Sequence, residues 1–119
     1  MAKILVVDDS MFQVKTIASI LTKQGHEVKT LLKSTEVISE LQTTSYNYLI
    51  SDLLMPGLDG ENLTKQIRAE GLEIPIIILS ANIQNKVKER CLSLGVNEFV
   101  NKPPTSENLE NAIKTVGLG

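Results

Sequence analysis

The chain has 119 residues, of which 42% are apolar and 22% are charged, and its formal net charge is −2. This composition is typical of one globular domain spanning residues 1–119, and it argues against a disordered chain. The charge balance provides no basic field for a phosphate backbone, so nucleic-acid binding by this domain is not expected. Cys91 is the single cysteine, and the first apolar run is too short for a signal peptide or membrane span. Both features favour a cytoplasmic location.

Short apolar runs alternate with segments of helical periodicity along the whole chain. The runs predict five strands, at residues 4–7, 27–31, 48–52, 75–79 and 98–100. The periodic segments predict five helices, which begin near Ser10, Ser34, Asp59, Gln84 and Ser106. We expect Gly25 and Gly95 to end the first and fourth helices, and Leu72 to belong to the third together with Leu63 and Ile67.

Strict alternation of strands and helices predicts an α/β domain with a parallel sheet, right-handed crossovers and helices on both faces. Five units are too few for an eight-stranded barrel. We therefore expect an open, doubly wound sheet of flavodoxin-like strand order, 2-1-3-4-5. Strands 1, 3 and 4 would be central in that order, which agrees with their being the most apolar.

Polar side chains stand at the carboxyl ends of four of these strands. The stretch from Tyr48 to Gly60 is the clearest case, because an apolar run ends in Asp52 and a proline and two glycines follow. Ligands of open α/β sheets bind at this edge. The other strand-end residues are Asp8, Asp9, Ser80 and Lys102. An aspartate cap or a solvated lysine would explain any one of them alone, but not the set.

Three carboxylates in one crevice repel one another unless a cation neutralises them. Carboxylate and carbonyl oxygens with water are the ligands that Mg²⁺ prefers. A hydroxyl from Ser80 and an ammonium from Lys102 are the groups that a phosphoryl on Asp52 would need around its oxygens.

Four motifs, in order and spacing, resemble the response-regulator receiver domains of two-component signalling, which include the chemotaxis-type, CheY-like single-domain receivers. The resemblance covers essentially the whole chain. The motifs are Val-Val-Asp-Asp-Ser at residues 6–10, Asp-Leu-Leu-Met-Pro-Gly-Leu-Asp-Gly at 52–60, Ile-Ile-Ile-Leu-Ser-Ala at 76–81 and Phe-Val-Asn-Lys-Pro at 99–103.

The resemblance implies that Asp52 is the phosphoacceptor for a histidine kinase, and that the chain catalyses only its own phosphorylation and dephosphorylation. It also implies a cis bond between Lys102 and Pro103. Further implied roles are Mg²⁺ binding by Asp8, Asp9, Asp52 and the backbone carbonyl of Leu54, phosphoryl contacts by Ser80 and Lys102, and a switch in which Phe99 turns inward as Ser80 moves.

Two positions bear on the lifetime of the phosphoryl group, Leu54 and Asn82. We hypothesise that Leu54, which has no polar group to orient water, slows hydrolysis of the aspartyl phosphate. His26 is expected to be a surface histidine and not a phosphoryl relay.

We expect a signalling switch that acts in chemotaxis or a phosphorelay as a stand-alone receiver, a monomer or a weak phosphorylation-dependent dimer. The downstream partner would bind the face of the fourth helix, fifth strand and fifth helix, beside the basic edge formed by Lys86, Lys88 and Arg90. The alternative is a receiver module of a longer regulator. A flavin carrier is disfavoured because Asp8 and Asp9 would repel a flavin phosphate, and a small-molecule phosphatase because no Asp-x-Asp pair follows the first strand.

Overall fold

The structure is a computed structural model that describes residues 2–81 and 84–118, so Asn82 lies outside the described residues. Five parallel strands form one sheet in the order β2-β1-β3-β4-β5, which confirms the predicted topology. The strands are β1 (Lys3–Val7), β2 (Glu27–Leu31), β3 (Tyr48–Asp52), β4 (Ile76–Ser80) and β5 (Glu98–Asn101). Strands β1, β3 and β4 are central and are the most buried, as expected.

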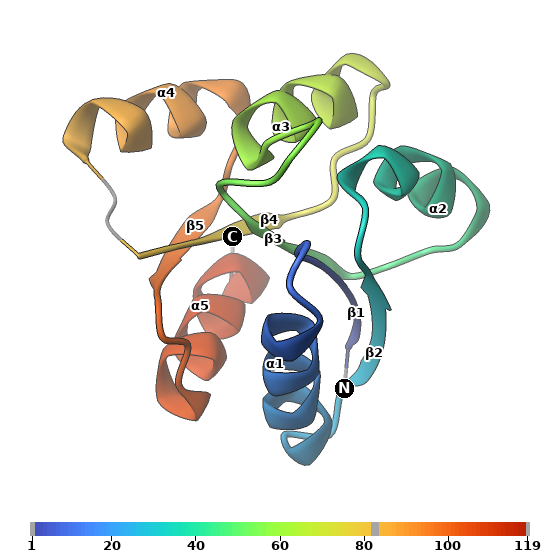
Figure 1. Cartoon of the computed structure of the whole chain (residues 1–119), viewed down its shortest axis with the longest axis vertical. Helices are drawn as coiled ribbons and strands as arrows, with labels where there is room; N and C mark the ends of the chain where they lie inside the picture. The colour runs from blue at the N-terminus through green and yellow to red at the C-terminus, as the bar shows by residue number, and fades with distance from the viewer. Residues whose placement is uncertain (1, 82–83, 119) are drawn as a thin grey trace.

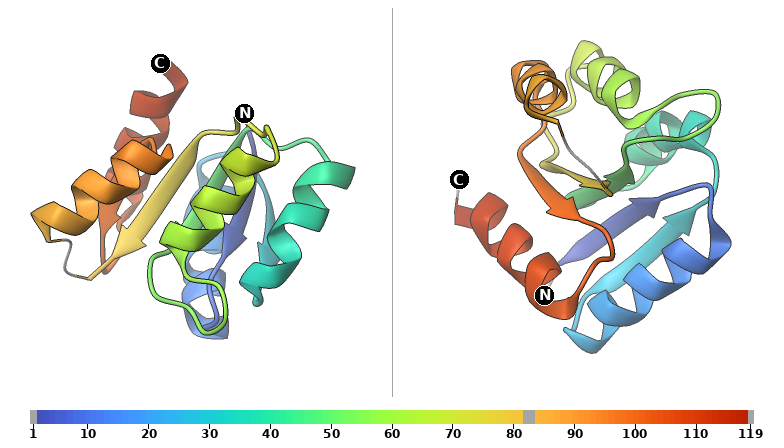
Figure 2. Two further views of the ribbon diagram at one scale, coloured as in Figure 1. Left: turned by 90° about the horizontal axis from the view of Figure 1, so that it is seen from above. Right: turned by 60° about the vertical axis from the view of Figure 1, so that its left-hand side comes forward.

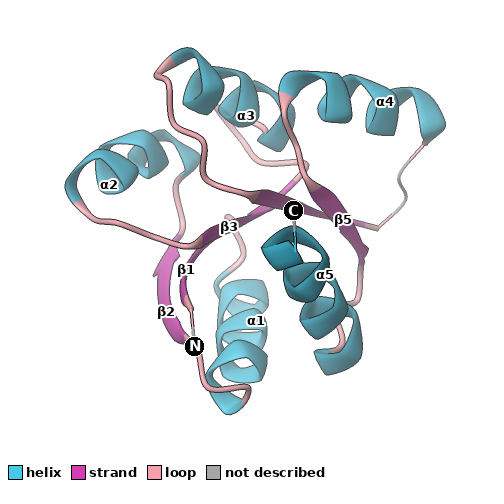
Figure 3. Cartoon of the chain, turned by 180° about the vertical axis from the view of Figure 1, so that it is seen from behind, coloured by secondary structure: helices cyan, strands magenta, loops and turns pink. Residues whose placement is uncertain are grey.

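Helices cover both faces of this sheet, as Figures 1 and 2 show. They are α1 (Met11–Lys23), α2 (Val37–Thr43), α3 (Gly60–Ala69), α4 (Asn85–Leu94) and α5 (Ser106–Leu118). Helices α1 and α5 lie on one face, and α2, α3 and α4 lie on the other (Figure 3). Within the described residues, no helix is both long and apolar enough to cross a membrane.

The sheet separates two apolar clusters because alternate strand residues point to opposite faces. Ile4 and Ile50 pack with the buried residues of α1 and α5. Leu5 and Leu49 pack with those of α2, α3 and α4, and Cys91 belongs to this second cluster. Strands that are buried on both faces are apolar along most of their length, which is why the sequence shows nearly continuous apolar runs.

Local side chains and glycines set most of the predicted boundaries. The Ser10 and Asp59 side chains accept backbone hydrogen bonds from Gln13 and Asn62, so both cap helices as expected. Gly25 and Gly95 have positive φ angles at the ends of α1 and α4. The hydroxyl that caps α5 comes from Thr105, which accepts from the Asn108 N–H.

Several predicted boundaries were wrong, most clearly at Leu72. Helix α3 ends at Ala69, and Leu72 follows Gly71, whose φ of +77° turns the chain out of the helix. Leu72 still packs against the core from that turn, so its spacing looked helical. Two other helix boundaries differ, because Ser34 begins a short 3₁₀ turn and Gln84 is the N-cap of α4. Among the strands, β1 begins at Lys3, Pro75 precedes β4, and β5 extends to Asn101.

His26 lies at the end of the sheet opposite the acidic strand ends, where its Nδ1 accepts a hydrogen bond from the Ala2 N–H at 3.1 Å. Burial lowers the pKa of His26, because the fold favours the neutral ring. The stability that the neutral His26 ring contributes is therefore complete above the pKa of the unfolded chain, near 6.5. It is lost as the pH falls through the lower pKa of the folded protein.

We expect the free energy of unfolding of the wild type to fall more between about pH 7.5 and about pH 5 than that of His26→Gln. Urea unfolding of both proteins at the two pH values measures the difference, and the common titration of other groups cancels. An equal pH dependence in the two proteins would contradict the role of His26.

Candidate functional site

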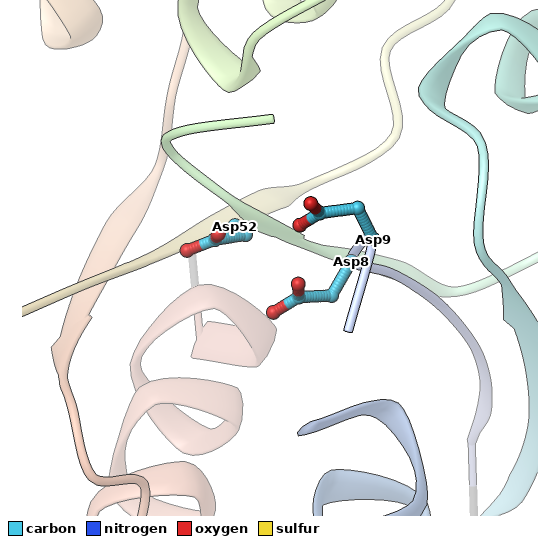
Figure 4. Close-up of side chains that lie close together, drawn as sticks. All are labelled: Asp8, Asp9 and Asp52. Atoms are coloured by element: carbon cyan, nitrogen blue, oxygen red, sulfur yellow. The ribbon is translucent and has the colours of Figure 1, made fainter. Parts of the chain in front are cut away.

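Three carboxylates meet where β1 and β3 end. Asp8 and Asp9 follow β1, and Asp52 is the last residue of β3. One oxygen from each of the three lies within 4.8 Å of the others. Figure 4 shows Asp8 and Asp9 extending from the end of β1 toward the side on which Asp52 lies. The parallel sheet thus brings together the three acids that the sequence placed at one edge.

Lys102 supplies the positive charge of this site from the end of β5. Its Nζ lies 2.6 Å from Asp52 Oδ1 and 3.8 Å from Asp8 Oδ2. The Lys102 N–H donates to the carbonyl of Ser80 at 2.9 Å, which holds the β5 end beside the β4 end. The peptide bond between Lys102 and Pro103 is cis, in agreement with the family resemblance.

Asp8 is the most constrained of the three acids. It is 2% exposed, and its Oδ1 accepts from the Ser10 N–H at 3.0 Å. Burial raises the pKa of the Asp8 carboxyl and the charge of Asp52 adds to this increase, whereas the Ser10 hydrogen bond and Lys102 oppose it. The Asp8 Oδ2 atom is buried and has no hydrogen-bond partner among the described residues.

This donor set fits a hard divalent cation such as Mg²⁺. All three groups offer carboxylate oxygens, which Mg²⁺ prefers over nitrogen or sulfur. The buried Asp8 Oδ2, which lacks a hydrogen bond, is the kind of atom that a cation would satisfy. Asp9 is exposed, so the site opens to solvent on that side and has access to water ligands.

The remaining predicted residues lie on β4, on β5 and in the segment that follows β3. Ser80 is 6% exposed at the end of β4, next to the strand that bears Asp52. Phe99 is half-buried on β5 and pairs in register with Ile78. Leu54 follows β3 with 76% of its surface exposed.

Two contributors to the site were missed at the sequence level. The Ser51 hydroxyl is buried and donates to the Asp52 carbonyl at 2.9 Å; a serine inside an apolar run was the available signal. Gly60 approaches the Asp52 carbonyl so closely that an added Cβ would lie 2.6 Å from that oxygen. Its sequence position suggested only the start of a helix.

Comparisons with known proteins agree with this geometry. Residues 4–114 match the family model described as the response regulator receiver domain. The chain is 33% identical over 110 residues to the sensor histidine kinase RcsC of Salmonella typhi, covering 92% of this chain and 12% of that protein. It is 30% identical to the alkaline phosphatase synthesis transcriptional regulatory protein PhoP of Bacillus subtilis, covering 96% of this chain and 48% of PhoP.

A solved structure of the chemotaxis protein CheY4 of Vibrio cholerae superposes with a TM-score of 0.90 at 28% identity, covering 96% of this chain and 97% of CheY4. The chain thus spans less than half the length of the two curated relatives but nearly all of a chemotaxis protein of the same fold. The matched residues include the three acids, Ser80 and Lys102. The chain belongs to the response regulator receiver domain family of two-component signalling.

Proposed function

We propose that Asp52 accepts a phosphoryl group from a histidine kinase and that the phosphorylated domain changes its affinity for a downstream partner. The observation that carries this proposal is the grouping of Asp52 with two further carboxylates and with the Lys102 ammonium, 2.6 Å from Asp52 Oδ1. In this mechanism an oxygen of Asp52 forms a bond to phosphorus. The phosphorus–nitrogen bond of the donor phosphohistidine breaks, and its electron pair leaves on the imidazole nitrogen.

Asp8, Asp9 and Asp52 would hold Mg²⁺ together with the backbone carbonyl of Leu54. A bound Mg²⁺ supplies charge neutralisation for the phosphoryl oxygens and for the carboxylates. Lys102 already lies between Asp8 and Asp52, where an ammonium would stabilise negative charge on a phosphoryl oxygen. Ser80, buried at the neighbouring strand end, would donate its hydroxyl to a second oxygen and couple the site to Phe99.

The domain is in this proposal a switch that catalyses only reactions of its own Asp52. Phosphorylation would shift the population toward an active state. The partner would bind the face formed by α4, β5 and α5, either as a separate protein or as another part of a longer regulator. A cytoplasmic location and a monomeric or weakly dimeric state remain predictions from the sequence.

The test is incubation of the protein with Mg²⁺ and a small phosphodonor such as acetyl phosphate, followed by intact-mass measurement. We expect a gain of one phosphoryl group, and strong suppression of that gain when EDTA removes the cation. No gain with donor and Mg²⁺ both present would refute the proposed function. Uptake that EDTA leaves unchanged would refute the role of the acids in holding a cation.

The lifetime of the phosphoryl group gives a second prediction at Leu54. Its side chain is exposed beside the site and cannot orient an attacking water. In Leu54→Asn the amide could do so, and we expect hydrolysis to become roughly five- to tenfold faster, the effect of one net hydrogen bond.

Loss of phosphoryl mass after donor removal measures the hydrolysis rate, and Leu54→Met is the apolar control, expected to match the parent. A Leu54→Asn protein that loses its phosphoryl group no faster than the parent contradicts the hypothesis.

A further inference from the structure

The ring of Phe99 lies against the side chain of Lys88, which comes from helix α4. The Lys88 Nζ is 5.5 Å from the centroid of the ring, within the range of a cation–π contact. Phe99 also packs against the apolar cluster beneath α3 and α4. Its ring is therefore contacted by the core on one side and by an exposed ammonium group on another.

The backbone at Phe99 connects this contact to the candidate site. Phe99 pairs with Ile78 on β4, and β4 ends two residues later at Ser80. The Phe99 N–H donates to its neighbour Glu98 Oε1 at 2.9 Å. Phe99 thus contacts α4 through Lys88, and its backbone is paired with the strand that ends in Ser80, one of the proposed phosphoryl ligands.

The helix that carries Lys88 is itself attached to the segment that follows Asp52. Arg90 of α4 makes two hydrogen bonds to the Glu61 carboxylate, at 3.0 and 3.1 Å. Glu61 belongs to the first turn of α3, one residue after Gly60. Lys88 therefore lies on a helix that also contacts the first turn of α3, the helix that follows the loop after Asp52.

We infer that Lys88 is a positioning residue that holds the Phe99 ring in its half-buried resting position, in contact with the Lys88 ammonium. The inference rests on the proposed function, in which the ring turns inward after phosphorylation of Asp52. An inward turn would separate the ring from the ammonium, so the contact favours the resting state. Exposed cation–π contacts of this kind correspond to about a two- to fivefold change in an equilibrium constant.

Loss of the contact should raise the fraction of active molecules by that factor. A ligand that binds only the active state has an apparent dissociation constant that varies inversely with the active fraction. Beryllofluoride with Mg²⁺ should therefore bind about two- to fivefold more tightly to Lys88→Gln than to the wild type. Calorimetry on unlabelled protein measures this constant. Lys88→Arg keeps a cation over the ring and should match the wild type.

The ring itself can be observed because the chain has two phenylalanines, Phe12 and Phe99. Incorporation of 4-fluorophenylalanine gives two fluorine resonances, and Phe12→Leu assigns them. We expect the Phe99 resonance of the wild type to move on addition of beryllofluoride and Mg²⁺. In Lys88→Gln without ligand, the resonance should already be displaced toward the bound position.

Lys86→Gln is the matched control, since it removes an equal charge from an exposed position of the same helix. The inference is overturned if Lys88→Gln and Lys86→Gln bind beryllofluoride equally. It is also overturned if the Phe99 resonance does not respond although Asp52 gains a phosphoryl group, an outcome that leaves the proposed function intact. A wild type that neither gains phosphoryl mass nor binds beryllofluoride refutes the proposed function, and the inference with it.

Discussion

The Asp52→Asn protein is expected to take up no phosphoryl group under conditions in which the wild type gains one. The substitution keeps the size of the side chain but removes the nucleophilic carboxylate oxygen. Asp8 is not expected to replace it, because the Lys102 ammonium lies 2.6 Å from Asp52 Oδ1 but 3.8 Å from Asp8 Oδ2. Intact-mass measurement with acetyl phosphate and Mg²⁺ compares the two proteins directly.

The matched control is Asp59→Asn, the same chemical change at an aspartate that caps helix α3. Asparagine caps helices about as well as aspartate, so this protein should fold and should gain one phosphoryl group like the wild type. Phosphoryl uptake by Asp52→Asn at the wild-type level would show that another residue is the acceptor. Peptide mapping would then identify it, with Asp9 and Ser80 as the first positions to examine.

The sequence was sufficient to predict the acidic site because that site depends on topology. Residues that follow parallel strands necessarily meet at one edge of the sheet, so Asp8, Asp9 and Asp52 could be grouped without coordinates. The same rule placed Ser80 and Lys102 at neighbouring strand ends. The distances between charges, such as the 2.6 Å between Lys102 and Asp52, depend on side-chain conformations that no periodic pattern encodes.

Features that depend on packing between distant elements were not predicted. In the sequence Lys88 was one of three residues of a basic helix edge, and its contact with Phe99 arises only when α4 packs beside β5. Leu72 has helical spacing from Leu63 and Ile67, but the positive φ of Gly71 ends the helix first. The Lys88 contact thus depends on tertiary packing, whereas the end of α3 is set locally by the backbone conformation of Gly71.

Gly60→Ala is expected to both destabilise the domain and slow phosphorylation of Asp52. A Cβ at this position would lie 2.6 Å from the Asp52 carbonyl oxygen and 3.1 Å from Leu53 Cα. Relief requires a backbone shift, for which overpacked sites typically lose about 1–3 kcal/mol of stability. The Gly60 N–H also donates to the Leu53 carbonyl at 2.8 Å, so the shift would be transmitted to the loop that follows Asp52.

We expect the initial rate of phosphoryl uptake by Gly60→Ala to fall about tenfold to a hundredfold, because a misplacement near 1 Å has effects of that size. Gly71→Ala separates this effect from instability. Gly71 has a φ of +77°, and nothing lies within 4 Å of an added Cβ. The Gly71→Ala protein should therefore lose about 1–2 kcal/mol of unfolding free energy through backbone strain alone. Urea unfolding should show comparable losses in the two variants, while only Gly60→Ala should lose phosphorylation rate. Equal rates in the two variants would mean that Gly60 supports the fold without positioning Asp52.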